Sequence, residues 1–363
     1  MGLCLGKSTS GGTSSSSLPC WPDLPLEILG LVLAHLASHD DRLSFAAVCR
    51  GWRLCAEHQR LLLPAAVPCI NLGGGAYQSL VDGKVRLFAT PNNGLVHSSY
   101  GSLLLSSSRR INSSSPCSRG GPFNVAPAPN FACFLPGTPQ PLSWSHAAGT
   151  SAGHYHGLDF FYMDVTIHQG KIFAIGWNRD LFVHEFLVGE AAALSQSRFE
   201  HVIKGEHRAP HAKYYLVTSS DNQKLMMVRW RIMDVVTDHH TMSLHVFEAD
   251  LDKGQWSAVK DMSNQVLFVG TTGSRALAVG GSSEQYRRSF QGGNRVFVLG
   301  SDWAWVRAMR RPAPCRCSDC RKLVDGIPSY CVYDMKTGKT SLVSLRGHTP
   351  TKSSRLEWFF PST

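Results

Sequence analysis

The spacing of apolar residues changes near residue 65. Before that point, apolar residues recur every three or four positions, which predicts one face of a helix: Ile28, Leu29, Val32, Leu33 and Leu36. Pro25 suits the first turn of this helix, and Ser38 to Asp40 are predicted to end it and cap a second. A third short helix is predicted after Gly51. Three helices in about forty residues cannot bury this apolar surface among themselves, so a partner is expected to cover the rest.

After residue 65 the pattern changes to short apolar runs joined by polar or glycine-containing turns, which predicts β-hairpins. The predicted strand pairs are KIFAIG with LFVHEFLV, KYYLVTS with KLMMVRWRI, MSLHVFEAD with QWSAVK, QVLFVG with RALAVG, RVFVLG with WAWVR, and YCVYDM with TSLVSL. Two of these hairpins, LHVFEADLDKGQWSAV and YCVYDMKTGKTSLV, have the same residue order and turn position.

Repeated four-stranded units of roughly 40 to 50 residues are typical of propeller blades. We therefore predict an all-β propeller over residues 65–363, with about six or seven blades, some of them degenerate. A β-sandwich is the alternative, but many sequential hairpins favour radial repetition. The serine-rich residues 104–122 and the basic residues 310–328 are predicted to form flexible loops.

The composition is globular, with 43% hydrophobic and 17% charged residues among 363. The longest apolar run, residues 28–37, contains His35 and is shorter than the ~18 residues of a membrane helix. The 11 cysteines are expected to stay reduced in the cytoplasm or nucleus. The net charge of +10 is interpreted as a solvated basic surface; an acidic partner is the alternative. No RNA motif or recognition helix accompanies the charge, so nucleic acid is not expected.

The N-terminal residues, MGLCLGKSTS, do not form a phosphate-binding loop, because only three residues separate Gly2 from Gly6. Residues 1–19 instead predict a disordered tail. Gly2 and Cys4 occupy positions typical of myristoylation and palmitoylation, although Gly6 stands where the usual motif has serine or threonine. Membrane attachment is expected only if these residues are acylated; an unmodified tail is the alternative.

No catalytic constellation stands out, so an enzyme and a cofactor are not expected. His154, His156 and Asp159, and likewise Asp238 to His240, lie close together without a nucleophile motif and are interpreted as loop residues. No metal site is predicted. The spacing of four cysteines suits a zinc site only in part: Cys315, Cys317, Cys320 and Cys331. They are interpreted as reduced thiols on a long loop, and a zinc site is the alternative.

Residues 20–60 resemble an F-box. The matching features are Leu24-Pro25, Glu27, Ile28-Leu29, Asp40-Asp41 and Val48-Cys49-Arg50-Gly51-Trp52. The resemblance implies that this small all-α module docks on the Skp adaptor of a cullin-based ubiquitin ligase. The residues implied to contact the adaptor are Leu24, Pro25, Ile28, Leu29, Val32 and Leu36. Packing against the chain's own downstream domain is the alternative.

The C-terminal region resembles the degenerate, kelch-like β-propeller that plant F-box proteins often carry. The matching segments lie between residues 160 and 306 and include FYMDVTIHQGKIFAI, YYLVTSSDNQKLMMVRW and NRVFVLGSDW; residues 70–150 match poorly. The two resemblances together imply a non-catalytic substrate receptor of an SCF-type ubiquitin ligase, whose propeller binds a target protein. The alternative is an F-box scaffold that acts outside any ligase. The sequence does not identify the target.

Overall fold

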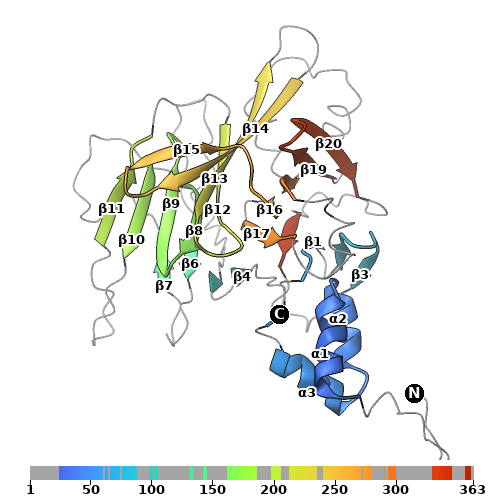
Figure 1. The fold of residues 1–363 in the computed structure, drawn as a ribbon. Helices are drawn as coiled ribbons and strands as arrows, with labels where there is room; N and C mark the ends of the chain where they lie inside the picture. Colours follow the sequence, from blue (N-terminus) through green and yellow to red (C-terminus); the bar gives the residue numbers. More distant parts are fainter. Residues whose placement is uncertain are drawn as a thin grey trace, which may run out of the picture. The chain divides into compact units, whose positions relative to one another are not determined.

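The computed structural model divides into two compact units, Met1–Pro64 and Ala65–Thr363. It describes residues 24–59, 62–63, 66–73, 76–87, 99–100, 103–104, 131–133, 142–144, 162–185, 198–205, 212–234, 240–270, 273–279, 290, 293–299, 329–345 and 356–360. The first unit is helical and the second consists of β-sheets (Figure 1). The predicted loops at 104–122 and 310–328 lie almost entirely outside the described residues, as does the tail at 1–19.

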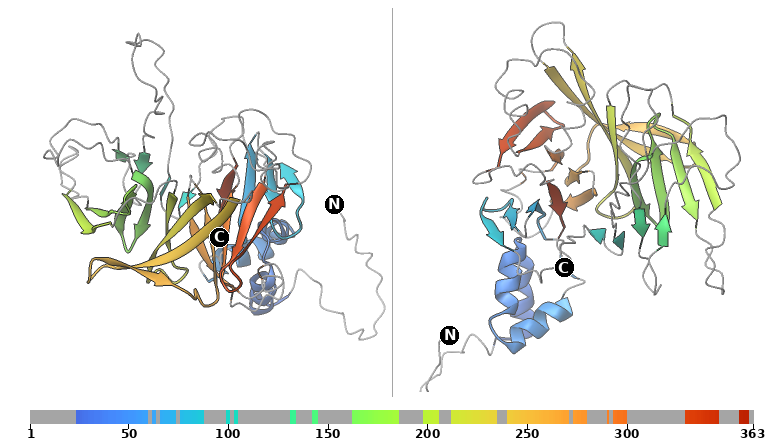
Figure 2. Two further views of the ribbon diagram at one scale, coloured as in Figure 1. Left: turned by 90° about the horizontal axis from the view of Figure 1, so that it is seen from above. Right: turned by 180° about the vertical axis from the view of Figure 1, so that it is seen from behind.

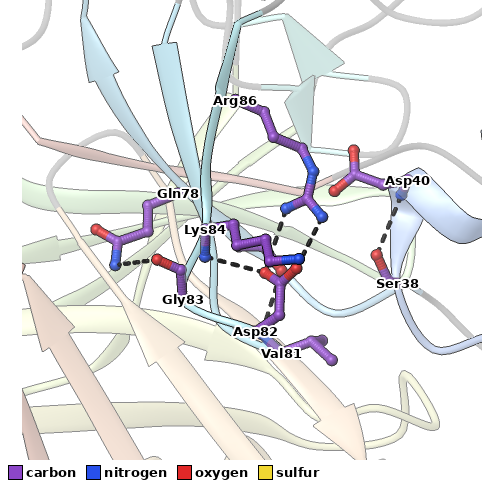
Figure 3. Close-up of polar contacts among 9 residues, drawn as sticks. Ser38, Asp40, Gln78, Val81, Asp82, Gly83, Lys84 and Arg86 are labelled. Carbon is purple, nitrogen blue, oxygen red and sulfur yellow. Dashed lines mark hydrogen bonds and ion pairs between the residues drawn. The ribbon is translucent and has the colours of Figure 1, made fainter. Parts of the chain in front are cut away.

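The first unit contains the expected helices, α1 (Leu26–His35), α2 (His39–Ala46) and α3 (Arg50–Gln59). Ser38 caps α2 as predicted, because its hydroxyl accepts a hydrogen bond of 3.2 Å from the Asp40 amide (Figure 3). A small core of Leu29, Leu33, Phe45 and Cys55 joins the three helices. The Phe45 and Trp52 rings, 4.5 Å apart between centroids, lock α2 against α3.

The second unit contains four sheets of four or five strands among the described residues. The first has the order β21 (Glu357–Phe359), β1 (Cys69–Gly73), β2 (Ala76–Ser79), β3 (Val85–Leu87). The second has the order β11 (Arg198–Ile203), β10 (Leu181–Glu185), β9 (Lys171–Gly176), β8 (Tyr162–His168). The third has the order β12 (Ala212–Thr218), β13 (Leu225–Asp234), β14 (His240–Asp250), β15 (Gln255–Val259).

The fourth sheet has the order β17 (Arg275–Ala278), β16 (Gln265–Val269), β18 (Arg295–Leu299), β19 (Ser329–Asp334), β20 (Lys339–Ser344). Two short ladders complete the described strands, β4 (Ser99–Tyr100) with β5 (Leu103–Leu104) and β6 (Phe131–Cys133) with β7 (Leu142–Trp144). The mostly β architecture agrees with the prediction. The number of six or seven blades stays a prediction.

The predicted hairpins β9–β10, β12–β13, β14–β15, β16–β17 and β19–β20 are all present as antiparallel pairs. The two hairpins with similar sequences also have the same geometry. Asp250 pairs with Gln255 and Asp334 with Lys339, and each turn ends in a glycine with positive φ, +62° at Gly254 and +67° at Gly338. The sequence similarity therefore reflects one turn design used twice.

The predicted pairing of RVFVLG with WAWVR is wrong. Strand β18 has β16 on one edge, in parallel, and β19 on the other, in antiparallel. A strand has only two hydrogen-bonding edges, so no ladder edge remains for WAWVR, which lies outside the described residues.

The second and third sheets share a hydrophobic core and lie side by side in both views of Figure 2. Strand β12 is buried on both faces from Ala212 to Val217, which explains why four consecutive apolar residues follow Lys213. Two hydrogen bonds also join the sheets: the Leu216 amide donates to the Asp164 carboxylate (2.7 Å) and the Thr218 hydroxyl donates to the Ile167 carbonyl (3.1 Å).

Strand β21, near the end of the second unit, pairs with a strand near the beginning of the same unit. It pairs with β1 from Cys69↔Phe359 to Asn71↔Glu357. Trp358 is 1% exposed, and its indole N–H donates to the Val269 carbonyl at 2.9 Å, which connects this sheet to β16. Contacts between residues far apart in sequence thus hold this unit together.

Candidate partner-binding surface of the helical unit

Helix α1 carries two apolar faces. One face packs into the helical core through Leu29 and Leu33, which are 1% and 0% exposed. The other carries Ile28, Leu31 and Val32, which are 45%, 61% and 37% exposed. Positions 28, 31 and 32 follow the i, i+3, i+4 spacing of one helical stripe. An exposed aliphatic stripe of this kind is typical of a binding surface.

The residues predicted to contact an adaptor fall into two groups. Pro25, Ile28 and Val32 are exposed and can contact a partner directly. Leu24 and Leu36 are half-buried and pack against the helical core. Leu29 lies inside that core, so in this conformation it supports the stripe and is not itself available for contact. Of the six residues predicted to contact an adaptor, those that are exposed lie at the start of α1 and on its outer face.

Other exposed apolar residues of this unit were missed by the sequence reasoning. Leu31 lies within the α1 stripe, and its spacing of three from Ile28 was the available signal. Leu26 is 57% exposed at the start of α1, while Leu43 and Val48 are 54% and 53% exposed at and after α2. The exposed apolar surface of the helical unit is therefore larger than the residues predicted to contact an adaptor.

The end of the F-box-like motif has a mainly structural position. Trp52 is half-buried against Phe45, and Cys55 lies in the core with its thiol donating to the Leu26 carbonyl at 3.7 Å. Burial raises the pKa of the Cys55 thiol, which keeps it protonated. Gly30 on α1 leaves room for Gln59, since an added Cβ would lie 3.2 Å from the Gln59 side-chain nitrogen. These contacts fix the orientation of α1 and hence of its outer stripe.

The four cysteines considered as zinc ligands lie mostly outside the described residues. Cys315, Cys317 and Cys320 are among the residues not described, whereas Cys331 is 2% exposed within β19 and packs in the hydrophobic core. Within the described ranges no group of three or more potential metal ligands occurs. The two histidine-containing clusters near 154–159 and 238–240 also lie outside the described side chains.

The acylation candidates Gly2 and Cys4 likewise lie outside the described residues. Among the helices of the described part of the chain, none is long and apolar enough to cross a membrane.

A family model described as the KIB1-4 beta-propeller matches residues 34–334, which is most of the chain. The match begins within α1 and extends to the end of β19, so it includes most of the described sheets. No curated protein and no solved structure matches the chain. On the strength of the family match and the sheet architecture, the chain belongs to the KIB1-4 β-propeller family.

Proposed function

We propose that this protein is a substrate receptor of an SCF-type ubiquitin ligase. The observation that carries the proposal is the exposed apolar stripe of α1, Ile28, Leu31 and Val32, on a helix whose opposite face already packs a complete small core. This stripe lies within the stretch that resembles an F-box. A Skp-type adaptor, which joins F-boxes to a cullin, is therefore the proposed occupant of the stripe.

The β-propeller supports the second half of the proposal. Propellers present loops from a rigid set of sheets, and such loops commonly bind other proteins. On this proposal the chain performs no chemistry itself. It holds a target protein near the charged ubiquitin carrier and so raises the effective concentration of the target's lysines.

The ligase proposal is tested by copurification of adaptor and cullin with the full chain from cells. Ile28→Asp places an unpaired carboxylate in the proposed interface. Burying it away from water costs several kcal/mol, so neither adaptor nor cullin should copurify with this variant. Replacing Leu24 and Pro25 together with alanine should weaken copurification as well. Unchanged recovery with folded Ile28→Asp protein would refute adaptor docking on α1.

An F-box scaffold outside a ligase is the second candidate, because an exposed stripe on α1 serves either role. A ligase receptor requires a bound cullin and a target that accumulates when the receptor is lost. A scaffold requires neither. Quantitative proteomics after depletion of the receptor, with and without proteasome inhibition, separates the two candidates.

Acylation of Gly2 and Cys4 would place this receptor at a membrane surface. One myristoyl chain gives only marginal membrane binding, on the order of 10⁴ M⁻¹, so both chains are needed for stable attachment. The mass of the N-terminal peptide from the native host tests this directly. A free or acetylated terminus would leave the protein in the cytoplasm or nucleus.

A further inference from the structure

One face of the third sheet carries two arginines, Arg229 and Arg231, that have no part in the proposed adaptor contact. Arg229 on β13 lies opposite Tyr214 on β12 and His245 on β14, and Arg231 lies in the next row, opposite Ala212 and Ser243. Cross-strand neighbours share a face, so the two arginines and the histidine form one polar region. This region continues the apolar face that packs on the second sheet.

The apolar side of this region orients Arg229. The Arg229 guanidinium carbon lies 5.1 Å from the centroid of the Phe247 ring, which is a cation–π contact. Phe247 and His245 are themselves stacked, with 6.4 Å between centroids. Stacking on a ring face uses the flat side of a guanidinium and leaves its N–H groups, which lie at the edge, free of the ring.

The arginines also have unfilled hydrogen-bonding capacity. The Nε atoms of Arg229 and Arg231 are both buried and, in the part of the chain that the structure describes, neither donates a hydrogen bond. Buried polar groups normally have a partner, so these donors indicate a missing acceptor. Neither arginine forms an ion pair with a carboxylate of the described residues.

The electrostatics agree with this geometry. Burial, together with the nearby Arg179 and Arg231, lowers the pKa of Arg229 below its ordinary value. Burial, Arg229 and Arg231 likewise lower the pKa of His245. Mutual repulsion among these groups would be relieved by an anion bound between them.

We propose that Arg229 and Arg231, with His245 at the exposed side, form an oxyanion-binding site for an acidic peptide segment of the target protein. A guanidinium binds a carboxylate or a phosphate through paired hydrogen bonds, so aspartate, glutamate and phosphorylated side chains share the required chemistry. The chain's net charge of +10 favours approach of such a segment. The inference rests on the propeller's proposed role in target binding and not on the adaptor contact.

The test uses the full chain and no adaptor, so its outcome is independent of the adaptor experiment. Fluorescence anisotropy is measured with a short labelled peptide rich in glutamate, with its glutamine counterpart, and with a singly phosphorylated peptide. The acidic peptides should bind and the glutamine peptide should not. Comparison of the glutamate and phosphorylated peptides, with inorganic phosphate as competitor, shows which oxyanion is preferred.

Replacing Arg229 and Arg231 with glutamine should weaken acidic-peptide binding roughly tenfold or more, because the hydrogen bonds from the two guanidiniums to the peptide's oxyanions are lost. The matched control is Lys336→Gln with Lys339→Gln, which removes two exposed charges from the β19–β20 turn and should leave affinity within about twofold. Equal loss in both double variants would show general charge attraction and overturn the proposed site.

A measurement on the wild-type protein avoids any folding defect of the variants. Hydrogen–deuterium exchange with saturating glutamate-rich peptide should show protection of residues 227–231 and 243–247. Protection confined to other segments, or tighter binding of a single-stranded oligonucleotide than of either acidic peptide, would overturn the proposal.

Discussion

At the scale of single residues, aspartates shape the turns between strands. The Asp82 carboxylate accepts from the Lys84 amide at 3.0 Å, Asp250 accepts from the Lys253 amide at 3.0 Å, and Asp334 accepts from the Thr337 amide at 3.1 Å. Each carboxylate satisfies an amide that the ladder leaves unpaired at the turn. Asp82 also binds Arg86 through two hydrogen bonds of 3.2 and 2.7 Å (Figure 3).

The Asp82–Arg86 pair gives a prediction about stability and pH. The hydrogen bond from Arg86 is the main cause that lowers the pKa of Asp82 from 3.8 to about 2. A lowered carboxylate pKa stabilises the fold above pH 3.8, and that contribution is lost as the pH falls toward 2. Because both side chains are about one-third exposed, we expect Asp82→Asn to cost about 1 kcal/mol at pH 6.

Urea unfolding of Asp82→Asn, Arg86→Gln and the double variant at pH 6 measures this contribution. The double variant should lose little more free energy of unfolding than either single variant, because both remove the same pair. Fully additive losses would show that the two side chains act independently. The difference between wild type and Asp82→Asn should shrink at pH 2.5.

At the scale of elements, hairpins were predictable because their signals are local. Each confirmed pair joins neighbouring segments, and glycine or a short polar run marks the turn between them. The parallel pairing of β16 with β18 was not predictable from the sequence. Strand β17 lies between them in the chain, and no local sequence signal in β16 or β18 indicates that they pair. The spacing of apolar residues predicted the three helices, but it did not distinguish the core residue Leu29 from the exposed Ile28.

The two similar turns give a prediction at this scale. Alanine at Gly338 meets open space, so its only effect is the strain of φ +67°, about 1 kcal/mol. Alanine at Gly254 has a similar strain and also places its Cβ 3.1 Å from the Val202 carbonyl oxygen. Gly254→Ala should therefore destabilise the protein more than Gly338→Ala. If urea unfolding gave both variants the wild-type free energy of unfolding, the positive φ angles at these two glycines would be wrong.

At the scale of the whole molecule, the β unit depends on contacts between its ends. Trp358 on β21 contacts the Phe268 ring edge-on at 5.2 Å between centroids and bonds to Val269, while its strand pairs with β1. Such pairing gives no stability until most of the unit is formed. A chain cut at residue 200 is thus expected not to fold, whereas residues from about 65 onward are expected to form one β-rich fragment.

Substitutions at Trp358 test this dependence. Trp358→Ala should lower the free energy of unfolding by about 3–5 kcal/mol, because it empties a buried site. Trp358→Phe keeps an aromatic ring but loses the hydrogen bond to Val269 and should cost about 1–2 kcal/mol. Hydrogen exchange should accelerate in β1 as well as β21 for the alanine variant. Effects limited to β21 would show that this pairing does not hold the unit together.

Docking of the outer stripe of α1 on a Skp-type adaptor can be measured by calorimetric titration of purified adaptor into the full chain. Ile28→Asp is compared with Val343→Asp, which places the same charge at an exposed apolar position of β20, 37% exposed. We expect saturable binding by the wild type and by Val343→Asp, and a loss of roughly a hundredfold in affinity for Ile28→Asp. Wild-type affinity of folded Ile28→Asp, or no binding by the wild type, would show that the adaptor does not dock on this stripe.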